Sequence, residues 1–162
     1  MSLELQSHDA EVQKNLEKII QKPIPLVKKF DHTHFGMKID KGKIIGIELH
    51  DQNLNQFPLS ILKLQNLTHL WLGKNNLNEI PKDIKLLTHL TELYLQHNQF
   101  TKLPPEILKL TNLKELNIGY NPFPNSESLE QLNNLSSLKK IYLPGLKLEF
   151  FPYWLHEMRQ LT

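Results

Sequence analysis

The chain has 162 residues, enough for one domain, and its 19 basic and 17 acidic residues leave a net charge of +2. Its longest basic runs are pairs, which excludes the extended basic face of a nucleic-acid or membrane-surface binder. The absence of cysteine excludes disulfides and thiolate metal sites, and no apolar run reaches the roughly 18 residues of a membrane helix. Because Met1 to Gln6 lack the layout of a signal peptide, we expect a cytoplasmic protein. A secreted protein is the alternative if an export signal is missing from the sequence as given.

Residues 1–43 form a predicted N-terminal cap. Ser7 or Asp9 can cap an amphipathic helix. Its apolar residues recur at the spacing of one helix face: Val12, Leu16, Ile19 and Ile20. Alternation on both sides of residues 40–42, an Asp-Lys-Gly turn, predicts a β-hairpin whose second arm runs into the first repeat. We expect the helix to cover the open core there, and docking into a partner's groove is the alternative.

Residues 44–162 hold about five repeats. The pattern LxxLxLxxNxL starts at Leu67, Leu90 and Leu113, 23 residues apart, and Ile44 begins a looser copy one period earlier. A fixed period of this length indicates a solenoid, in which each repeat buries its apolar side against its neighbours. Within each repeat, LxL predicts a short strand of a parallel sheet. The Leu-Pro-x-x-Ile segment that follows predicts a 3₁₀ return segment, because its apolar residues recur every third position.

The last two repeats depart from this pattern. The fourth repeat is longer, and residues 125–128 (Asn-Ser-Glu-Ser) predict the N-cap of a true α-helix. In the final repeat, aromatic residues cluster between Phe150 and Trp154, where we expect them to seal the core at a natural end. Alternatively, this cluster joins two copies of the chain in a weak homodimer.

These repeats closely resemble the leucine-rich repeat family, in particular its bacterial 23-residue LPxxI class and the repeat-only proteins of pathogenic spirochaetes. The resemblance implies an α/β fold: a curved solenoid with a parallel β-sheet on the concave face and 3₁₀ or short helices on the convex face. It also implies a ladder of buried asparagines that bond the backbone of adjacent turns, here Asn75, Asn98 and Asn121. Gln52 takes this slot in the first repeat, and Leu146 breaks the ladder in the last.

The candidate site lies on the outward-facing strand positions. Side chains alternate along a strand, so the residues between the buried leucines face the concave side. Several are aromatic residues that the repeat does not require, and exposed aromatics are typical of interface hot spots. Plain surface cover is the alternative. The candidate partner-binding residues are Glu48, His50, His69, Trp71, Glu92, Tyr94, Gln96, His97, Asn117, Tyr120 and Tyr142.

We expect no catalytic residues, no metal site and no cofactor. No phosphate-binding loop, nucleophile elbow or His-Glu-x-x-His motif is present. The concave histidines come from different repeats, and Asp31, His32 and His34 fit a polar surface segment better than a chelate. The sequence therefore predicts a non-enzymatic module that binds another protein through its concave face, without nucleic-acid binding or membrane insertion. The alternative is a structural solenoid that self-associates through its C-terminal end.

Overall fold

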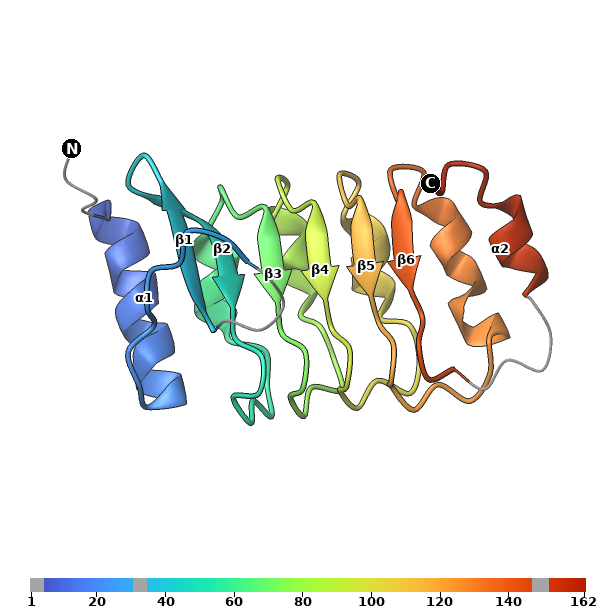
Figure 1. The fold of residues 1–162 in the computed structure, drawn as a ribbon, viewed down its shortest axis with the longest axis horizontal. Helices are drawn as coiled ribbons and strands as arrows, with labels where there is room; N and C mark the ends of the chain where they lie inside the picture. The colour runs from blue at the N-terminus through green and yellow to red at the C-terminus, as the bar shows by residue number, and fades with distance from the viewer. Residues whose placement is uncertain (1–4, 31–34, 147–151) are drawn as a thin grey trace.

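A computed structural model describes residues 5–30, 35–146 and 152–162, whose elements follow one another along a single stack (Figure 1). Helix α1 (Ser7–Ile20) precedes the antiparallel pair β1 (Gly36–Asp40) and β2 (Lys43–Glu48). Four three-residue strands follow: β3 (His69–Trp71), β4 (Glu92–Tyr94), β5 (Glu115–Asn117) and β6 (Lys140–Tyr142). Within the described residues these strands form one sheet in chain order, parallel from β2 onward.

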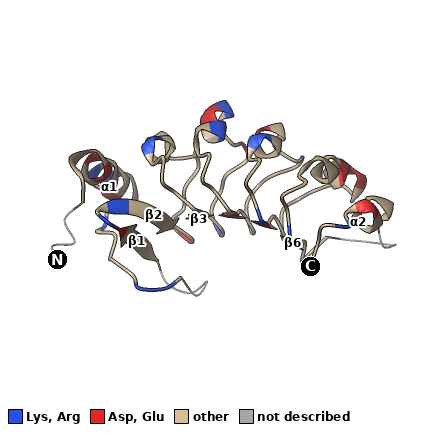
Figure 2. Cartoon of the chain, turned by 90° about the horizontal axis from the view of Figure 1, so that it is seen from above, with Lys and Arg blue, Asp and Glu red and all other residues tan. Residues whose placement is uncertain are grey.

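The return segments lie on the opposite side of the stack from the sheet. They are the 3₁₀ helices η1 (Leu59–Lys63), η2 (Lys82–Leu86), η3 (Pro105–Lys109) and η4 (Glu127–Asn134). Seen from above, the strands line the inner side of a shallow arc and the helices its outer side (Figure 2). The strand leucines and the return-segment isoleucines fill the space between these layers and are buried. The predicted α/β solenoid is therefore confirmed.

Helix α1 closes the N-terminal end of this core. Val12 and Leu16 are buried in the core cluster, as the helical spacing predicts. The predicted capping role of Ser7 or Asp9 is wrong, because Gln6 occupies the cap position and no side chain bonds the free N–H groups. Asp9 instead lies within the first turn, where its buried Oδ2 accepts the Ile44 N–H at 2.7 Å. This acid therefore attaches the helix to the hairpin.

The hairpin forms where the sequence places it. Lys41 and Gly42 both adopt positive φ, 48° and 75°, which is the requirement of a two-residue type I′ turn. Strand β2 then pairs with β3 in parallel, so the hairpin extends the repeat sheet by one strand. The segment before β1 adds further cover to the sheet edge, because the Val27 N–H donates to the Met37 carbonyl at 2.9 Å.

The asparagine ladder joins each repeat to the one before it. The Asn75 Nδ2 donates to the carbonyls of Leu49, at 2.8 Å, and Leu72, at 3.0 Å. Its Oδ1 accepts the N–H groups of Gln52 and Leu54, both at 3.0 Å. Corresponding bonds recur at the next two ladder positions, Asn98 and Asn121. A buried amide can donate and accept at once, so it satisfies backbone groups that the tight turns leave inside.

The fourth return segment corrects one expectation. Element η4 is a 3₁₀ helix, so the predicted true α-helix is wrong. Its buried residues Leu129 and Leu132 are three positions apart, which suits three residues per turn better than 3.6. The predicted cap residue does act near the start of the helix, since Asn125 Oδ1 accepts the Ser128 N–H at 3.1 Å.

The C-terminal end is covered by helix α2 (Tyr153–Glu157). Trp154 is buried against η4, and its Nε1–H donates to the Ser126 carbonyl at 3.0 Å. Tyr153, one position earlier, is 77% exposed. Phe150 and Phe151 of the predicted aromatic cluster lie outside the described residues. Within the described part, Trp154 therefore acts as a seal, while Tyr153 faces solvent.

Candidate functional site

The parallel register places the candidate residues in rows across the concave face. Each step from one strand to the next advances the chain by the repeat length, so equivalent positions lie side by side. One row contains Gly46, His69, Glu92, Glu115 and Lys140. The next outward-facing row contains Glu48, Trp71, Tyr94, Asn117 and Tyr142. These rows agree with the arrangement that the 23-residue period predicts.

The expectation that Trp71 and Tyr94 face solvent is wrong. Both residues are only 5% exposed. They are nevertheless not part of the leucine core, which lies on the other side of the sheet. The two rings pack on each other, with centroids 5.0 Å apart and planes tilted by 55°. Both residues project from the concave side of the sheet and are covered there. The aromatic surface open to a partner is therefore smaller than the sequence suggests.

Phe30 supplies part of this cover. Its ring lies 5.1 Å from the Trp71 ring and 6.0 Å from the His69 ring, measured between centroids. Gly46 provides the space, because a Cβ at this position would clash with the Phe30 ring. Sequence reasoning missed Phe30, which lies in the non-repeating arm between α1 and β1. A glycine inside a strand is the available signal, since it often marks a close approach by another group.

Tyr94 lies at the centre of a polar and aromatic network. Its hydroxyl donates to Glu115 Oε2 at 3.1 Å, and Lys140 Nζ contacts the other oxygen of this carboxylate at 2.7 Å. Burial, followed by the neighbouring Glu115 charge, raises the pKa of Tyr94, so the phenol stays protonated and acts as a donor. The Tyr142 ring lies 6.2 Å from Tyr94 on the open side. These contacts hold the central aromatic residues in place and compensate the Glu115 charge.

Two further acids of this face pair with histidines. Glu92 Oε1 lies 3.2 Å from His69 Nε2, and Glu48 Oε1 lies 2.9 Å from His50 Nδ1. Burial, followed by the positive charge of Lys74, lowers the pKa of His50. The His50 imidazole is therefore neutral at pH 7, so its contact with Glu48 is not a full ion pair. The acids of the concave face are thus engaged within the chain.

The exposed aromatic residues lie toward the C-terminal half of the face. Tyr120 is 52% exposed and Tyr142 is 40% exposed. The Tyr120 ring stacks on His97 at 4.2 Å with an interplanar angle of 11°, so the two form a flat ledge. Both residues adopt positive φ, as do Asp51 and Lys74 in the preceding repeats. This left-handed turn at the end of each strand aligns the outermost row of side chains.

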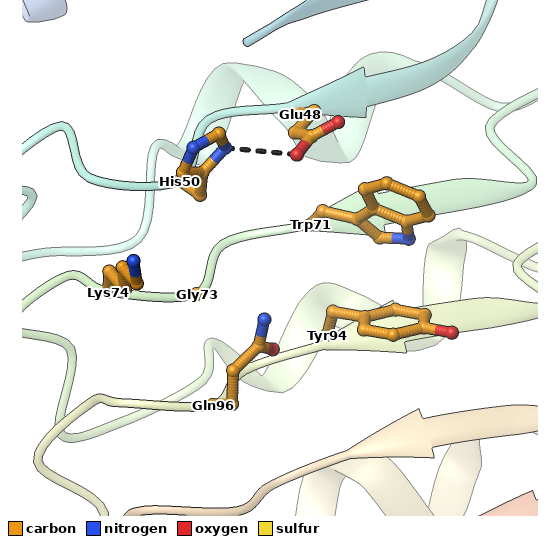
Figure 3. A pocket seen from close by; sticks show the side chains of 7 residues that line it. All are labelled: Glu48, His50, Trp71, Gly73, Lys74, Tyr94 and Gln96. Atoms are coloured by element: carbon orange, nitrogen blue, oxygen red, sulfur yellow. Dashed lines mark ion pairs between the residues drawn. The ribbon is translucent and has the colours of Figure 1, made fainter. Parts of the chain in front are cut away.

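A hollow of about 260 Å³ opens between His50 and Gln96 near the middle of the face (Figure 3). Its lining residues are Glu48, His50, Trp71, Gly73, Lys74, Tyr94 and Gln96. The Gln96 amide lies against Gly73, where a Cβ would approach it to 2.7 Å. Small-molecule sites usually measure about 300–1,000 Å³. The hollow is therefore slightly smaller than a typical small-molecule site.

The remaining candidate residues divide by exposure. His50, His69, Glu92, Gln96 and Asn117 are partly exposed, His97 is exposed, and Glu48 is buried at 1%. Among the described residues, no three His, Asp or Glu side chains are grouped so that they could hold a metal ion. Asp31, His32 and His34 lie outside the described residues. In the described ranges, no helix combines the length and apolar character needed to cross a bilayer.

The regular coils and their shared curved sheet define a class, the solenoid proteins built from stacked strand-and-return units. Residues 46–161 match a family model described as leucine-rich repeat region. The chain belongs to the leucine-rich repeat family. No match was found among curated protein sequences. Proteins of this family generally mediate contacts with other proteins.

Several solved structures share the fold. A leucine-rich repeat protein of Leptospira interrogans is 33% identical, with a TM-score of 0.59 over 70% of this chain and 29% of its own. An internalin of Listeria monocytogenes is 23% identical, with a TM-score of 0.53 over 71% of this chain and 31% of its own. A third is the ectodomain of the Arabidopsis thaliana receptor kinase GASSHO1/SCHENGEN3, solved in complex with CASPARIAN STRIP INTEGRITY FACTOR 2. It is 25% identical, with a TM-score of 0.63 over 97% of this chain and 20% of its own. The chain thus spans less than a third of each.

Proposed function

We propose that the chain is a non-catalytic module that binds another protein through the open C-terminal half of its concave face. The observation that carries this proposal is the exposure of Tyr120 and Tyr142 on a sheet whose other central aromatic residues are covered. Large aromatic side chains gain affinity because they bury much surface with few rotatable bonds. The stacked His97 and the partly exposed Asn117 add hydrogen-bonding groups beside them.

Surface area limits the strength of this contact. Five strands spaced about 4.8 Å, each spanning about five residues at 3.3 Å intervals when the flanking turn residues are included, project a face of about 300 Å². A standard protein interface buries about 800 Å² on each partner. A partner that touches the open half alone is therefore held weakly, and a stable complex needs additional surface from the loops or the N-terminal cap.

Replacing Tyr120 and Tyr142 together by alanine tests the site. We expect partner capture to fall by about 30-fold or more, because a single hot-spot residue contributes about 2 kcal/mol. The measurement compares immobilised wild-type and variant protein in a pull-down from the native source, with bound proteins quantified by mass spectrometry. Leu86→Ala is the matched control, since Leu86 is 51% exposed but lies on the convex side in η2. Equal capture by the double variant and the wild type would reject this surface.

Self-association through the C-terminal end is a second candidate function. It is supported by Tyr153, which is 77% exposed beside the buried Trp154. For a dimer of this kind we expect a mass that rises with concentration in sedimentation equilibrium and returns to the monomer value in Tyr153→Ser. A wild-type protein that stays monomeric over the whole accessible concentration range contradicts this alternative.

A further inference from the structure

Residues 21–30, the arm that follows α1, reach the concave face of the sheet. It is attached to β1 at Pro25 and Val27, whose backbone groups bond Met37 on either side at 2.9 Å. Beyond this attachment come Lys28, Lys29 and Phe30. Figure 2 shows this segment on the strand side of the stack, opposite the return helices. The arm is thus a short length of the chain's own backbone lying where a bound partner would lie.

Phe30 is held in a slot on this face. The slot is bounded by the Trp71 and His69 rings, whose centroids lie 5.1 Å and 6.0 Å from that of Phe30. Gly46 forms its base, where a Cβ would clash with the Phe30 ring. Phe30 itself is only partly buried. Its removal would therefore leave an aromatic-lined depression at the centre of the face rather than a hole in the leucine core. This depression has the size and chemistry to accept one aromatic side chain.

The surroundings of the slot favour a basic neighbour beside that aromatic residue. A hollow of about 310 Å³ lies next to Phe30, lined among others by Lys29, Glu92 and Glu115. Glu92 and Glu115 occupy adjacent strands in the same row and are the two acids of this hollow, where they also contact His69 and Lys140. Lys38 lines the hollow as well. The exposed Lys29 lies at this hollow, immediately before Phe30 in the chain. Basic and acidic groups therefore complement one another where the arm meets the sheet.

We infer that the Lys28-Lys29-Phe30 segment is an intramolecular ligand that a partner must displace. The fitting partner presents an extended segment in which an aromatic residue follows one or two basic residues. This inference rests on the proposed function, because it concerns the covered half of the same concave face. Displacement of the arm uncovers the slot beside Trp71, and it supplies part of the contact area that the open half lacks.

Competition by the arm lowers the apparent affinity of such a partner. When the binding-competent state is only a fraction of the population, the apparent dissociation constant rises by the inverse of that fraction. A partly buried phenylalanine is enough to keep the covered state about tenfold more populated than the open one. Phe30→Ala is therefore expected to tighten binding of a suitable segment by about tenfold or more.

The first test measures whether Phe30 covers Trp71. The chain has two tryptophans, so Trp154→Phe leaves Trp71 as the single reporter. In this background we expect Phe30→Ala to shift the emission to longer wavelength and to increase quenching by acrylamide. Gly46→Ala should do the same without changing the arm, because its added Cβ occupies the place of the Phe30 ring. Phe30→Leu, which keeps an apolar cover, should stay close to the parent. Unchanged emission and quenching in both Phe30→Ala and Gly46→Ala overturn the inference.

The second test measures what the uncovered slot accepts. The probe is the acetylated and amidated hexapeptide Pro-Leu-Val-Lys-Lys-Phe, the sequence of residues 25–30, titrated into the Phe30→Ala, Trp154→Phe protein. We expect the probe to reverse the Trp71 emission shift, with binding about tenfold or more tighter than to the protein that retains Phe30. Matched peptides ending in alanine, or with both lysines replaced by glutamate, should bind at least about tenfold more weakly. Equal binding of the probe and both control peptides overturns the stated partner chemistry.

The two proposals fail in different ways. Capture that is insensitive to Tyr120 and Tyr142 rejects the proposed contact surface, whatever Trp71 reports. Capture that depends on these tyrosines, combined with no response of Trp71 to Phe30→Ala or Gly46→Ala, rejects the intramolecular ligand alone. Circular dichroism and thermal melting of each variant show that the solenoid is intact in the fluorescence experiments.

Discussion

Asn75→Leu is expected to lower the free energy of unfolding by about 3 kcal/mol or more. Several buried backbone groups lose their hydrogen-bond partner, and each such loss costs about 1–3 kcal/mol. The substitution leaves the N–H groups of Gln52 and Leu54 without their acceptor. It also removes the donor to the carbonyls of Leu49 and Leu72. Leucine is close to asparagine in shape, so the effect reports lost hydrogen bonds rather than lost volume. Urea denaturation followed by circular dichroism measures the change.

Asn76→Leu is the matched control for this experiment. Asn76 lies in the same turn but is exposed, and its backbone N–H donates to the Leu54 carbonyl. A leucine side chain leaves that backbone bond intact, so we expect a change within about 0.5 kcal/mol. Similar losses for both variants would mean that the ladder amides contribute no more than any polar residue of the turn.

Trp71→Ala is expected to destabilise the fold by about 3 kcal/mol, at the low end for a buried aromatic residue reduced to alanine. Trp71 is 5% exposed and packs on Phe30 and Tyr94, so its removal opens a gap beneath the arm. The gap lies on the concave side rather than in the leucine core. The neighbouring Phe30 and Tyr94 rings can relax into it, which keeps the loss at the low end. Thermal melting and urea denaturation measure the loss.

Tyr120→Ala shows whether the loss of stability in Trp71→Ala comes from burial of the side chain or from its position on the concave face. Tyr120 belongs to the same concave surface but is 52% exposed, so we expect its truncation to change stability by only about 0.5 kcal/mol or less. If Trp71→Ala were as mild as Tyr120→Ala, the covered half of the face would be open in solution. The contrast also decides which aromatic substitutions can be used in capture experiments without disturbing the fold.

Repetition explains which parts of this structure follow from the sequence. A pattern that returns every 23 residues sets strand register, so the row of Glu48, Trp71 and Tyr94 follows from counting alone. The asparagine ladder is equally local in origin, because each amide occupies one slot of one turn. Hairpin geometry follows from Lys41-Gly42, whose positive φ values suit the turn.

The errors arise where the repeat pattern does not apply. Burial of Trp71 depends on Phe30, a residue of the irregular arm, and no periodicity links these two positions. The strand glycine Gly46 indicates a close approach without saying which group approaches. In the fourth repeat, capping residues favoured an α-helix, but the three-residue spacing of Leu129 and Leu132 prevailed. The expected capping role of Asp9 is wrong for a similar reason. Asp9 bonds Ile44 instead, and that bond depends on the tertiary docking of α1, which local sequence does not indicate.

The ladder amides also determine how a disturbance travels through the molecule. Asn98 bonds Leu72 of the preceding coil and groups of its own turn, and Asn121 bonds Leu95 in the same way. Such nearest-neighbour coupling makes the chain behave as a row of linked units, in which damage fades with distance from its origin. At the last repeat, Leu146 offers no amide for this bond. The coil that contains β6 therefore lacks one of the side-chain links that join the coils around Trp71 and Tyr94, and we expect its backbone amides to exchange with solvent faster than theirs.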